Sequence, residues 1–262
     1  MKADEMAEKL GSWLARMRRP GWKPVVKEGD GFATGSKFGG VPWNGPGVPW
    51  PVCGNCLEPL TPFLQLDLDD LPEELGGRFG SGLLQLFYCV RVDCDGDEGW
   101  EPFESGLSLV RVVHLAGSGP IRPAPPGMPL MPEKRIVGWE RFEDLPHPEE
   151  HDENGLAYTY DFERGTLRWE CPEVGLDHEQ PMSECEAEEI AVAESGDKLG
   201  GWSAWVQGVE YPDCPTCGER MVLVFQVDSE DNVPFMFGDC GTGHVTQCPK
   251  HKDVVAFGWA CC

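Results

Sequence analysis

The chain repeats part of its own sequence at a fixed distance, and no other feature constrains its fold as strongly. The segment that begins at Ser36 returns in the second half of the chain, beginning at Asp197. Three pairs of blocks keep this same offset: SKFGGVP and DKLGGWS, CGNC and CPTC, and FLQLD and VFQVD. Because chance does not preserve both order and spacing in this way, the sequence indicates an internal duplication of one structural unit.

Each copy is predicted to consist of β-strands. The runs FLQLDL and LVFQVD are short, apolar and bounded by Pro, Asp and Ser, as is typical of buried strands. GLLQLFYC, LSLVRVVHL, HVTQC and VVAFGWACC are further strand candidates, and 33 glycines and 24 prolines leave little room for long helices. We therefore expect a mainly β (β-rich α+β) fold with a short N-terminal helix.

The N-terminal helix is predicted from periodicity. Five apolar residues recur at three- and four-residue spacing and would share one helical face: Met6, Leu10, Trp13, Leu14 and Met17. Pro20 ends the pattern, because the residue before a proline avoids the α conformation. We expect this helix to pack against the rest of the chain rather than to seek a partner.

The charge of the chain is strongly negative and unevenly distributed. The 262 residues include 45 Asp and Glu against 21 Lys and Arg, a formal charge of −24, which disfavours direct binding to nucleic acid. Between Glu140 and Asp197 there are 19 acidic residues and three arginines, a net charge of −16. This stretch is either a solvated face or a docking surface for a basic partner.

These patterns divide the chain into four segments within one compact unit. We predict an N-terminal helix in residues 1–20, a first β repeat in 21–139, an acidic connecting segment in 140–196 and a second β repeat in 197–262. Within the acidic segment, LAYTYDF and TLRWECP resemble strands joined by a turn at Gly165.

The compartment is predicted from composition at the N-terminus and along the chain. No run of 18 apolar residues occurs, and the start MKADEMAEKLGSW lacks the apolar core of a signal peptide. We therefore expect a cytoplasmic protein with reduced thiols and no membrane contact. Its 12 cysteines then need an explanation other than disulfides.

Four cysteines of the first copy have the spacing of a metal site. Cys53 and Cys56 form a CxxC pair, and Cys89 and Cys94 follow as a second pair. A CxxC pair presents two sulfurs at the tip of a turn, and a second pair completes a tetrahedron around Zn²⁺. Buried free cysteines are the alternative, whereas a thioredoxin-type redox motif is disfavoured because each CxxC precedes a strand.

The second copy offers a matching set of ligands. Cys214 and Cys217 form its CxxC pair, and Cys248 opens the sequence CPKH, so that His251 completes a Cys3His site. The duplication thus predicts one metal site in each copy.

The fourth ligand of the second site has an alternative at the C-terminus. Cys261 or Cys262 can replace His251, but a hairpin of HVTQC and VVAFGWACC would hold both at the far end from Cys248, which favours the histidine. The cysteines to which no ligand spacing assigns a role are Cys171, Cys185, Cys240, Cys261 and Cys262.

Both predicted sites are closed, and no catalytic motif accompanies them. A catalytic zinc keeps one position for water, whereas four ligands, mostly thiolate, indicate a structural ion. The motifs G-x-S-x-G, H-E-x-x-H and G-x-x-x-x-G-K-[ST] do not occur. We therefore predict two structural Zn²⁺ ions and a protein that is not an enzyme.

The two Gly-Gly turns are candidate partner-binding corners, because tryptophans flank them and such pairs can frame a peptide-binding cleft. The alternative is that these rings cover the core. Gln65 and Gln226 lie at equivalent places in apolar strands; we expect them to tie the backbone of one repeat to the other, with ligand contact as the alternative. The corner residues are Gly39, Gly40 and Trp43, and then Gly200, Gly201, Trp202 and Trp205.

The same motifs resemble a known family. KFGGxP, CxxC, FLQLDL and GLLQLFYC in the first copy, and KLGGW, CPxCG, LVFQVDSED, QCPxH and FGWACC in the second, are similar to the YwqG-like bacterial proteins over about residues 20–262. That domain of unknown function is distantly similar to the eukaryotic programmed-cell-death-protein-2 type, whose members are chaperones for a nascent ribosomal protein. The resemblance implies two intertwined β-sheets made by duplication, and no catalytic residues.

The negative charge of the chain, its two predicted closed metal sites and its resemblance to the family all favour the same class of function. We expect a non-enzymatic, zinc-stabilised protein-binding module that chaperones or sequesters a basic protein, such as a ribosomal protein. The alternatives are an immunity protein that neutralises a basic toxin, and a metal-dependent hydrolase, which would need an open metal position.

Overall fold

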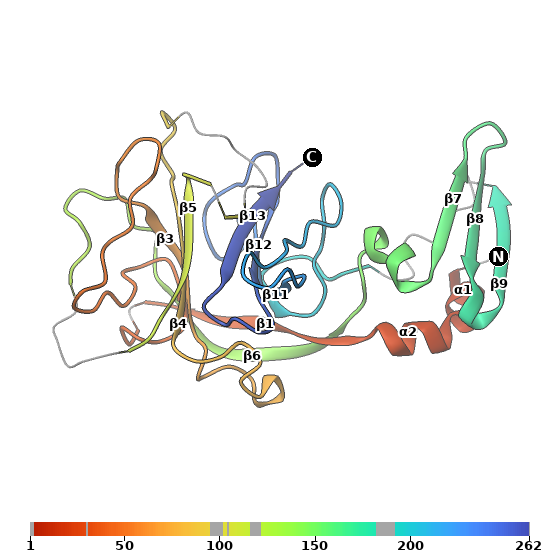
Figure 1. Ribbon diagram of the computed structural model, residues 1–262, viewed down its shortest axis with the longest axis horizontal. Helices are drawn as coiled ribbons and strands as arrows, with labels where there is room; N and C mark the ends of the chain where they lie inside the picture. Colours follow the sequence, from red (N-terminus) through yellow and green to blue (C-terminus); the bar gives the residue numbers. More distant parts are fainter. Residues whose placement is uncertain are drawn as a thin grey trace.

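The protein consists of a large β-sheet body and a smaller lobe beside it (Figure 1). The body is a ten-stranded antiparallel sheet, and the lobe combines a three-stranded sheet with the N-terminal helices. The mainly β fold class is confirmed. The computed structural model describes residues 3–29, 31–94, 102–103, 105–115, 122–181 and 192–261.

The ten strands fall into two sets of five that mirror each other along the sheet. Their order is β13-β12-β11-β10-β1-β6-β2-β3-β4-β5, so that β10–β13 repeat the arrangement of β2–β5. The first set is β1 (Arg19–Glu28), β2 (Lys37–Phe38), β3 (Thr61–Asp67), β4 (Leu83–Tyr88) and β5 (Ser108–Val113). The second set is β6 (Lys134–Asp144), β10 (Lys198–Gly200), β11 (Val222–Asp228), β12 (Thr242–Gln247) and β13 (Val255–Ala260).

The first strand of each set crosses into the other set. β1 pairs with β10 of the second set, and β6 pairs with β2 of the first. The two crossing strands also pair with each other over ten positions, from Arg19 opposite Asp144 to Glu28 opposite Lys134. The two halves are therefore intertwined by strand exchange, and their hydrogen bonds join them into one continuous sheet.

The central strands of each set are buried on both faces. All six residues of β4 and all six of β12 are buried, although neighbouring residues of a strand point to opposite faces. On one side Phe63, Tyr88 and Phe237 form part of an aromatic cluster with ring centroids 5.5–6.0 Å apart. The sheet curls so that its edge strands β5 and β13 approach each other (Figure 1).

The smaller lobe has its own core. The predicted helical face is confirmed, because Met6, Leu10, Trp13 and Met17 are all buried. Two helices share this face instead of one, α1 (Ala3–Lys9) and α2 (Gly11–Met17), with a turn at Leu10. None of the helices in the described part of the chain has the length and apolar character of a membrane span. The lobe's strands are β7 (Ala157–Asp161), β8 (Thr166–Cys171) and β9 (Leu176–Pro181).

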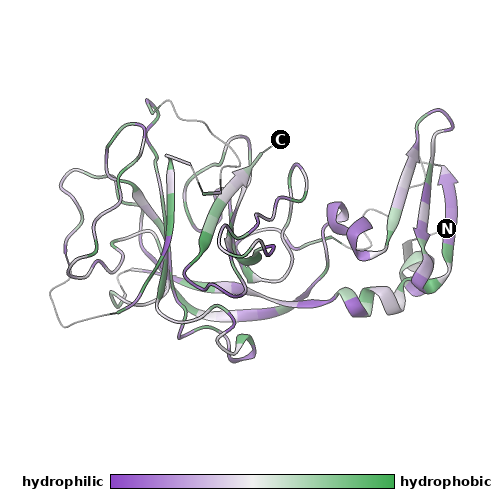
Figure 2. Ribbon diagram, viewed as in Figure 1, coloured by the Kyte–Doolittle hydropathy of each residue, from purple (hydrophilic) through white to green (hydrophobic). Residues whose placement is uncertain are grey.

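The strands LAYTYDF and TLRWECP expected in the acidic segment correspond to β7 and β8, which are joined at Gly165. Leu167 and Trp169 of β8 point inward against the helices, whereas the edge strand β9 is largely hydrophilic (Figure 2). This alternation places the apolar side of the small sheet on α1 and α2 and its polar side outward.

Each buried glutamine side chain hydrogen-bonds to backbone groups of its own repeat. Gln65 accepts a hydrogen bond from the Trp43 backbone N–H at 2.7 Å and donates to the Gly35 carbonyl at 2.9 Å. Gln226 makes the same bonds at the equivalent positions of the second repeat, with the Ala204 N–H and the Gly196 carbonyl. The expectation that these side chains connect the two repeats was wrong. Each repeat pairs its short second strand with its own third strand, and this brings each glutamine beside its own Gly-Gly corner.

Strand β6 holds both Gly-Gly corners through buried carboxylates. Asp144, at its end, bonds the Lys198 ammonium at 2.9 Å and the Trp202 N–H at 2.8 Å. Glu133, directly before its start, bonds Lys37 at 3.1 Å. All four charged side chains are at most 11% exposed, so each ion pair compensates charges that would be costly to bury alone.

Replacing Gly201 by alanine tests the Asp144 connection. A Cβ there would lie 2.4 Å from Asp144 Oδ2, and the glycine has φ +72°, so we expect a loss of about 3 kcal/mol or more in the free energy of unfolding. Gly165→Ala is the matched control: its φ is +65°, and nothing lies within 4 Å of its Cβ position, so backbone strain alone costs about 1 kcal/mol. Urea unfolding measures both, and equal losses would contradict the account.

Candidate metal centres

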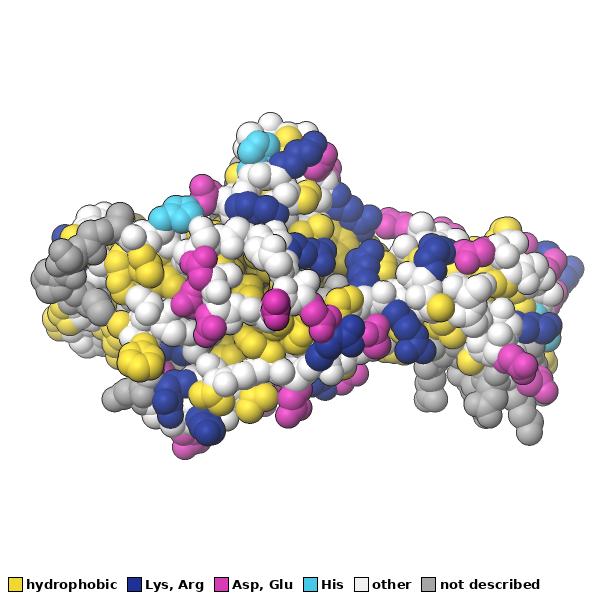
Figure 3. Space-filling view, turned by 90° about the horizontal axis from the view of Figure 1, so that it is seen from below, with side chains coloured by type: hydrophobic (Ala, Val, Ile, Leu, Met, Phe, Trp, Pro, Cys, Tyr) yellow, Lys and Arg dark blue, Asp and Glu magenta, His cyan; other side chains and the backbone are white. Residues whose placement is uncertain are grey.

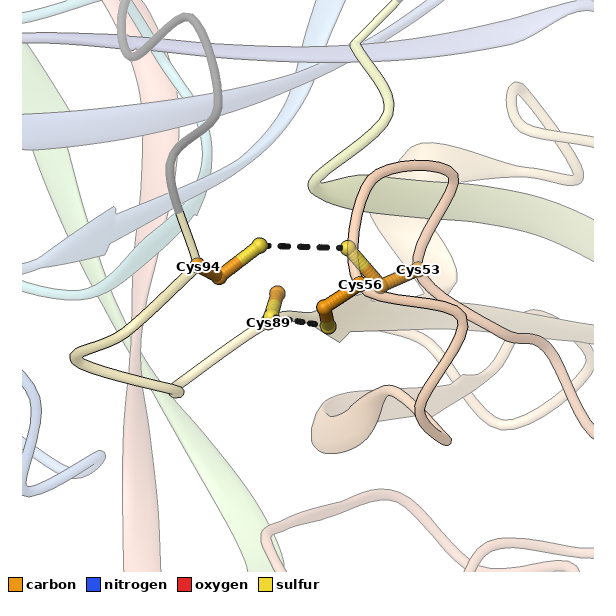
Figure 4. Close-up of side chains that lie close together, drawn as sticks. All are labelled: Cys53, Cys56, Cys89 and Cys94. Atoms are coloured by element: carbon orange, nitrogen blue, oxygen red, sulfur yellow. Dashed lines mark hydrogen bonds between the residues drawn. The ribbon is translucent and has the colours of Figure 1, made fainter.

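The first group of predicted ligands meets at one end of the β3–β4 hairpin (Figure 4). Cys53 and Cys56 lie in the turn before β3, and Cys89 directly follows β4; Thr61 pairs with Tyr88, so the antiparallel pairing brings both ends together. Cys53 Sγ is 3.6 Å from Cys94 Sγ, and Cys56 Sγ is 3.8 Å from Cys89 Sγ.

The second group forms at the equivalent end of the β11–β12 pair. His251 Nδ1 lies 3.7 Å from Cys214 Sγ and 3.6 Å from Cys248 Sγ, and Cys217 Sγ lies 3.7 Å from Cys248 Sγ. In each group the four ligand atoms all lie within 4.8 Å of one another. The structure therefore gathers the eight predicted ligand residues into two groups of four.

The donor spacing fits a four-coordinate metal ion. A tetrahedron with metal–sulfur bonds of about 2.3 Å has sulfur–sulfur edges of about 3.8 Å, and its sulfur–nitrogen edges are about 3.6 Å. The observed separations of 3.6–3.8 Å match these edges. They are far longer than the roughly 2.05 Å of a disulfide bond.

The two CxxC turns share the same pattern of backbone hydrogen bonds. The Cys53 N–H donates to the Glu58 carbonyl at 2.8 Å, and the Cys214 N–H donates to the Glu219 carbonyl at 2.8 Å. An isolated β-bridge closes each turn at matching positions, Val52 with Pro59 and Asp213 with Arg220. The backbone of the turn thus positions its two sulfurs, and the turn is part of the duplicated unit.

Backbone N–H groups favour the ionised, thiolate form of two cysteines in the second group, Cys214 and Cys248. Burial opposes ionisation of the Cys214 thiol, but hydrogen bonds from the N–H groups of Thr216 and Cys217 and from the side chains of His251 and Cys248 together lower its pKa to about 6. The N–H groups of Lys250 and His251 lie 3.4 and 3.2 Å from Cys248 Sγ. Because the thiolate is the metal-binding form, these contacts prepare the site for a cation.

Cys261 does not join the second group. β12 and β13 form the expected hairpin, in which Gln247 pairs with Val255 near Cys248 and Thr242 pairs with Ala260 at the opposite end. Cys261 follows Ala260 and therefore lies at the end away from the ligands. Of the remaining cysteines, Cys171 is buried in the lobe and Cys240 is exposed, while Cys185 and Cys262 lie outside the described residues.

The candidate partner-binding corners lie inside the fold. Trp43, Trp202 and Trp205 are 8%, 2% and 4% exposed, so their rings cover the core, the alternative that the sequence left open. The Trp202 indole donates to the Met17 carbonyl at 2.8 Å and joins the two lobes. The corner glycines have φ between +59° and +72°, a conformation that favours glycine: Gly39, Gly40, Gly200 and Gly201.

Sequence reasoning missed the carboxylates that hold these corners. Glu133 and Asp144 lie far from their lysine partners in the chain and occupy opposite ends of β6. The available signal was the lysine that stands two residues before each Gly-Gly pair, at equivalent positions of the two copies.

Comparison with known proteins identifies the family. Residues 36–251 match the model of the domain of unknown function DUF1963, and the chain belongs to this family. It is also 44% identical over 45 residues to the uncharacterized protein YpfL of Salmonella typhimurium, a match that covers 17% of this chain and 11% of that protein. The YwqG-like name and the similarity to the programmed-cell-death-protein-2 type stay predictions.

Substitution of the fourth ligand tests the second centre. We expect His251→Ala to lose one bound metal ion per chain, because three donors no longer close the tetrahedron, and Cys261→Ala to keep the full complement. Elemental analysis after dialysis measures both, and His251→Cys, which restores a fourth donor, serves as the rescue. A metal content that falls in Cys261→Ala and not in His251→Ala would contradict the assignment.

Proposed function

We propose that the protein is a non-enzymatic binding protein whose fold is held by two structural Zn²⁺ ions and whose client is a basic protein. The observation that carries the first part is the closure of both groups: seven sulfurs and one imidazole nitrogen occupy all eight tetrahedral positions. Such a donor set leaves no position for water, so the metal would stabilise structure rather than activate a nucleophile.

Zinc suits these donors better than harder cations do. Thiolate and imidazole are soft to intermediate ligands, and tetrahedral geometry with mostly sulfur donors is typical of Zn²⁺. Seven thiolates and two Zn²⁺ change the formal charge by −7 + 4, from −24 to −27. Metal binding would therefore leave the chain at least as attractive to a basic partner.

Several carboxylates of the acidic segment form ion pairs with lysines and arginines of the same chain. Glu173 pairs with Arg16, Glu194 with Lys23, and further carboxylates pair with arginines of the segment itself. The exposed carboxylates of this segment that neither form an ion pair nor accept a side-chain hydrogen bond within the described residues are Glu140, Glu149, Asp152 and Glu163. We propose these as the acidic surface that attracts a client.

Affinity purification from cells at low salt tests the client. We expect a small basic protein, such as a ribosomal protein, in stoichiometric amount by mass spectrometry, and its loss at high salt because exposed charges are screened. Neutralising the four unpaired carboxylates should weaken recovery at least about tenfold through lost electrostatic steering and attraction. A control variant neutralises four exposed carboxylates elsewhere: Glu28, Asp70, Glu73 and Asp239.

The outcomes separate the candidate functions. Recovery of a basic toxin would assign an immunity role instead of a chaperone role. Recovery of the protein alone, or equal loss of the client in the control variant, would contradict the proposed acidic surface.

Metal removal tests the structural role of the ions. We expect a strong chelator to unfold at least one half of the sheet, because a structural zinc centre contributes about 10 kcal/mol or more of binding free energy to folding. Circular dichroism and thermal unfolding report the loss, and added Zn²⁺ should restore the fold. Cys240→Ser, an exposed cysteine outside both groups, should behave like the unaltered protein. An unchanged melting temperature after metal removal would contradict the structural role.

A further inference from the structure

An arginine-lined hollow lies where the small lobe meets the large sheet. It has a volume of about 360 Å³ and is formed by the start of β1, the Gly-Gly corner of the second repeat and the short helices η2 (Pro148–Glu150) and η3 (Asp152–Asn154). Three arginines from separate parts of the chain converge on it: Arg19, Arg78 and Arg220. Figure 3 shows Lys and Arg side chains gathered in the middle of one face, between the broad and the narrow part of the molecule.

Aromatic rings lie beside all three of these guanidinium groups, and the guanidinium carbon of Arg78 is 5.6 Å from the Phe79 ring centroid. Arg19 lies with its guanidinium carbon 3.2 Å from the ring centroid of Trp202, whose buried ring is itself fixed by its bond to Met17. Arg220 lies 4.6 Å from the Tyr211 ring. Stacking covers a face of a guanidinium but leaves the N–H groups at its edge available to an acceptor.

Most of these N–H donors bond no acceptor in the part of the chain that the structure describes. Among the described residues the guanidinium groups of Arg19 and Arg78 donate no hydrogen bond and form no ion pair within 4 Å, whereas Arg220 bonds Glu153 at 2.7 Å. Burial lowers the pKa of Arg19; among the nearby groups, Tyr211 and Glu150 raise it, whereas Arg78 and Arg220 lower it. The three charges therefore lie close enough to repel one another.

The two carboxylates that line the hollow already have partners other than Arg19 and Arg78. Glu153 pairs with Arg220, and Glu150 accepts hydrogen bonds from the Trp205 indole at 2.7 Å and the Tyr211 hydroxyl at 3.2 Å. Three arginines against two glutamates leave a local charge of +1 in a chain whose net charge is −24. The hollow thus combines an excess of positive charge with guanidinium N–H groups that bond no acceptor within the described residues.

We propose that the hollow binds the oxyanion group, phosphate or carboxylate, of a small ligand, with Arg19 and Arg78 as its principal donors. A planar guanidinium presents two parallel N–H groups to such an anion and strengthens the contact through its charge. The volume falls in the range of small-molecule pockets. This site is independent of the proposed basic client, because its charge selects the opposite kind of partner.

Isothermal titration of the metal-loaded, full-length protein tests the proposal, with inorganic phosphate, pyrophosphate and citrate as probes. We expect saturable binding of at least one probe, weakened about tenfold or more in Arg78→Gln and in Arg19→Gln through the loss of charge-assisted hydrogen bonds. Arg164→Gln, at the exposed turn between β7 and β8, removes the same charge far from the hollow and should bind like the unaltered protein.

The probes and variants make every outcome decisive. Preference for the phosphates or for citrate identifies which oxyanion the site takes. Arg78 is exposed and its guanidinium has no hydrogen bond to the described residues, so Arg78→Gln keeps the test valid if loss of the Arg19 stack perturbs folding. No saturable binding of any probe, or equal weakening in Arg164→Gln, would overturn the proposal.

Discussion

The pairing of β1 with β6 is the interaction on which the rest of the structure depends. Each of these strands belongs by sequence to one repeat and completes the sheet of the other. β6 also anchors both Gly-Gly corners, through Glu133 before its start and Asp144 at its end. Because each half takes one strand from the other, neither half forms its complete sheet alone. Loss of a buried carboxylate on β6 would leave a lysine charge without compensation.

This shared sheet places one closed donor group in each repeat. The CxxC turn precedes the third strand and the other two ligands follow the fourth, so antiparallel pairing alone brings the four side chains together. The same turn hydrogen bonds occur at equivalent positions of both copies, so the turn that carries two of the donors is a feature of the repeated unit. The difference is confined to one ligand, a cysteine in the first copy and His251 in the second. Thiolate-rich, fully coordinated centres support a role in stability.

The sequence predicted what is local or repeated and missed what depends on distant contacts. The constant offset between the copies, the helical face through Trp13 and the eight ligand residues follow from spacing, which a single sequence displays directly. The ion pairs of Lys37 and Lys198 join residues about 50–100 positions apart, and the strand exchange joins residues about 100–180 positions apart. No periodicity encodes such distant partners. The same holds for Arg19, Arg78 and Arg220, which only the folded chain brings to one hollow. The glutamine bonds were misassigned because equivalence by sequence does not reveal which backbone lies nearby.

X-ray absorption spectroscopy at the zinc edge of the purified protein tests the central claim most directly. The account predicts two zinc ions per chain with four-coordinate shells that together contain seven sulfurs and one imidazole nitrogen, at metal–sulfur distances of about 2.3 Å. It predicts no oxygen neighbour in either shell. A zinc–oxygen distance, or a sulfur content well below this ratio, would reveal an open position and contradict the structural assignment of the metal centres.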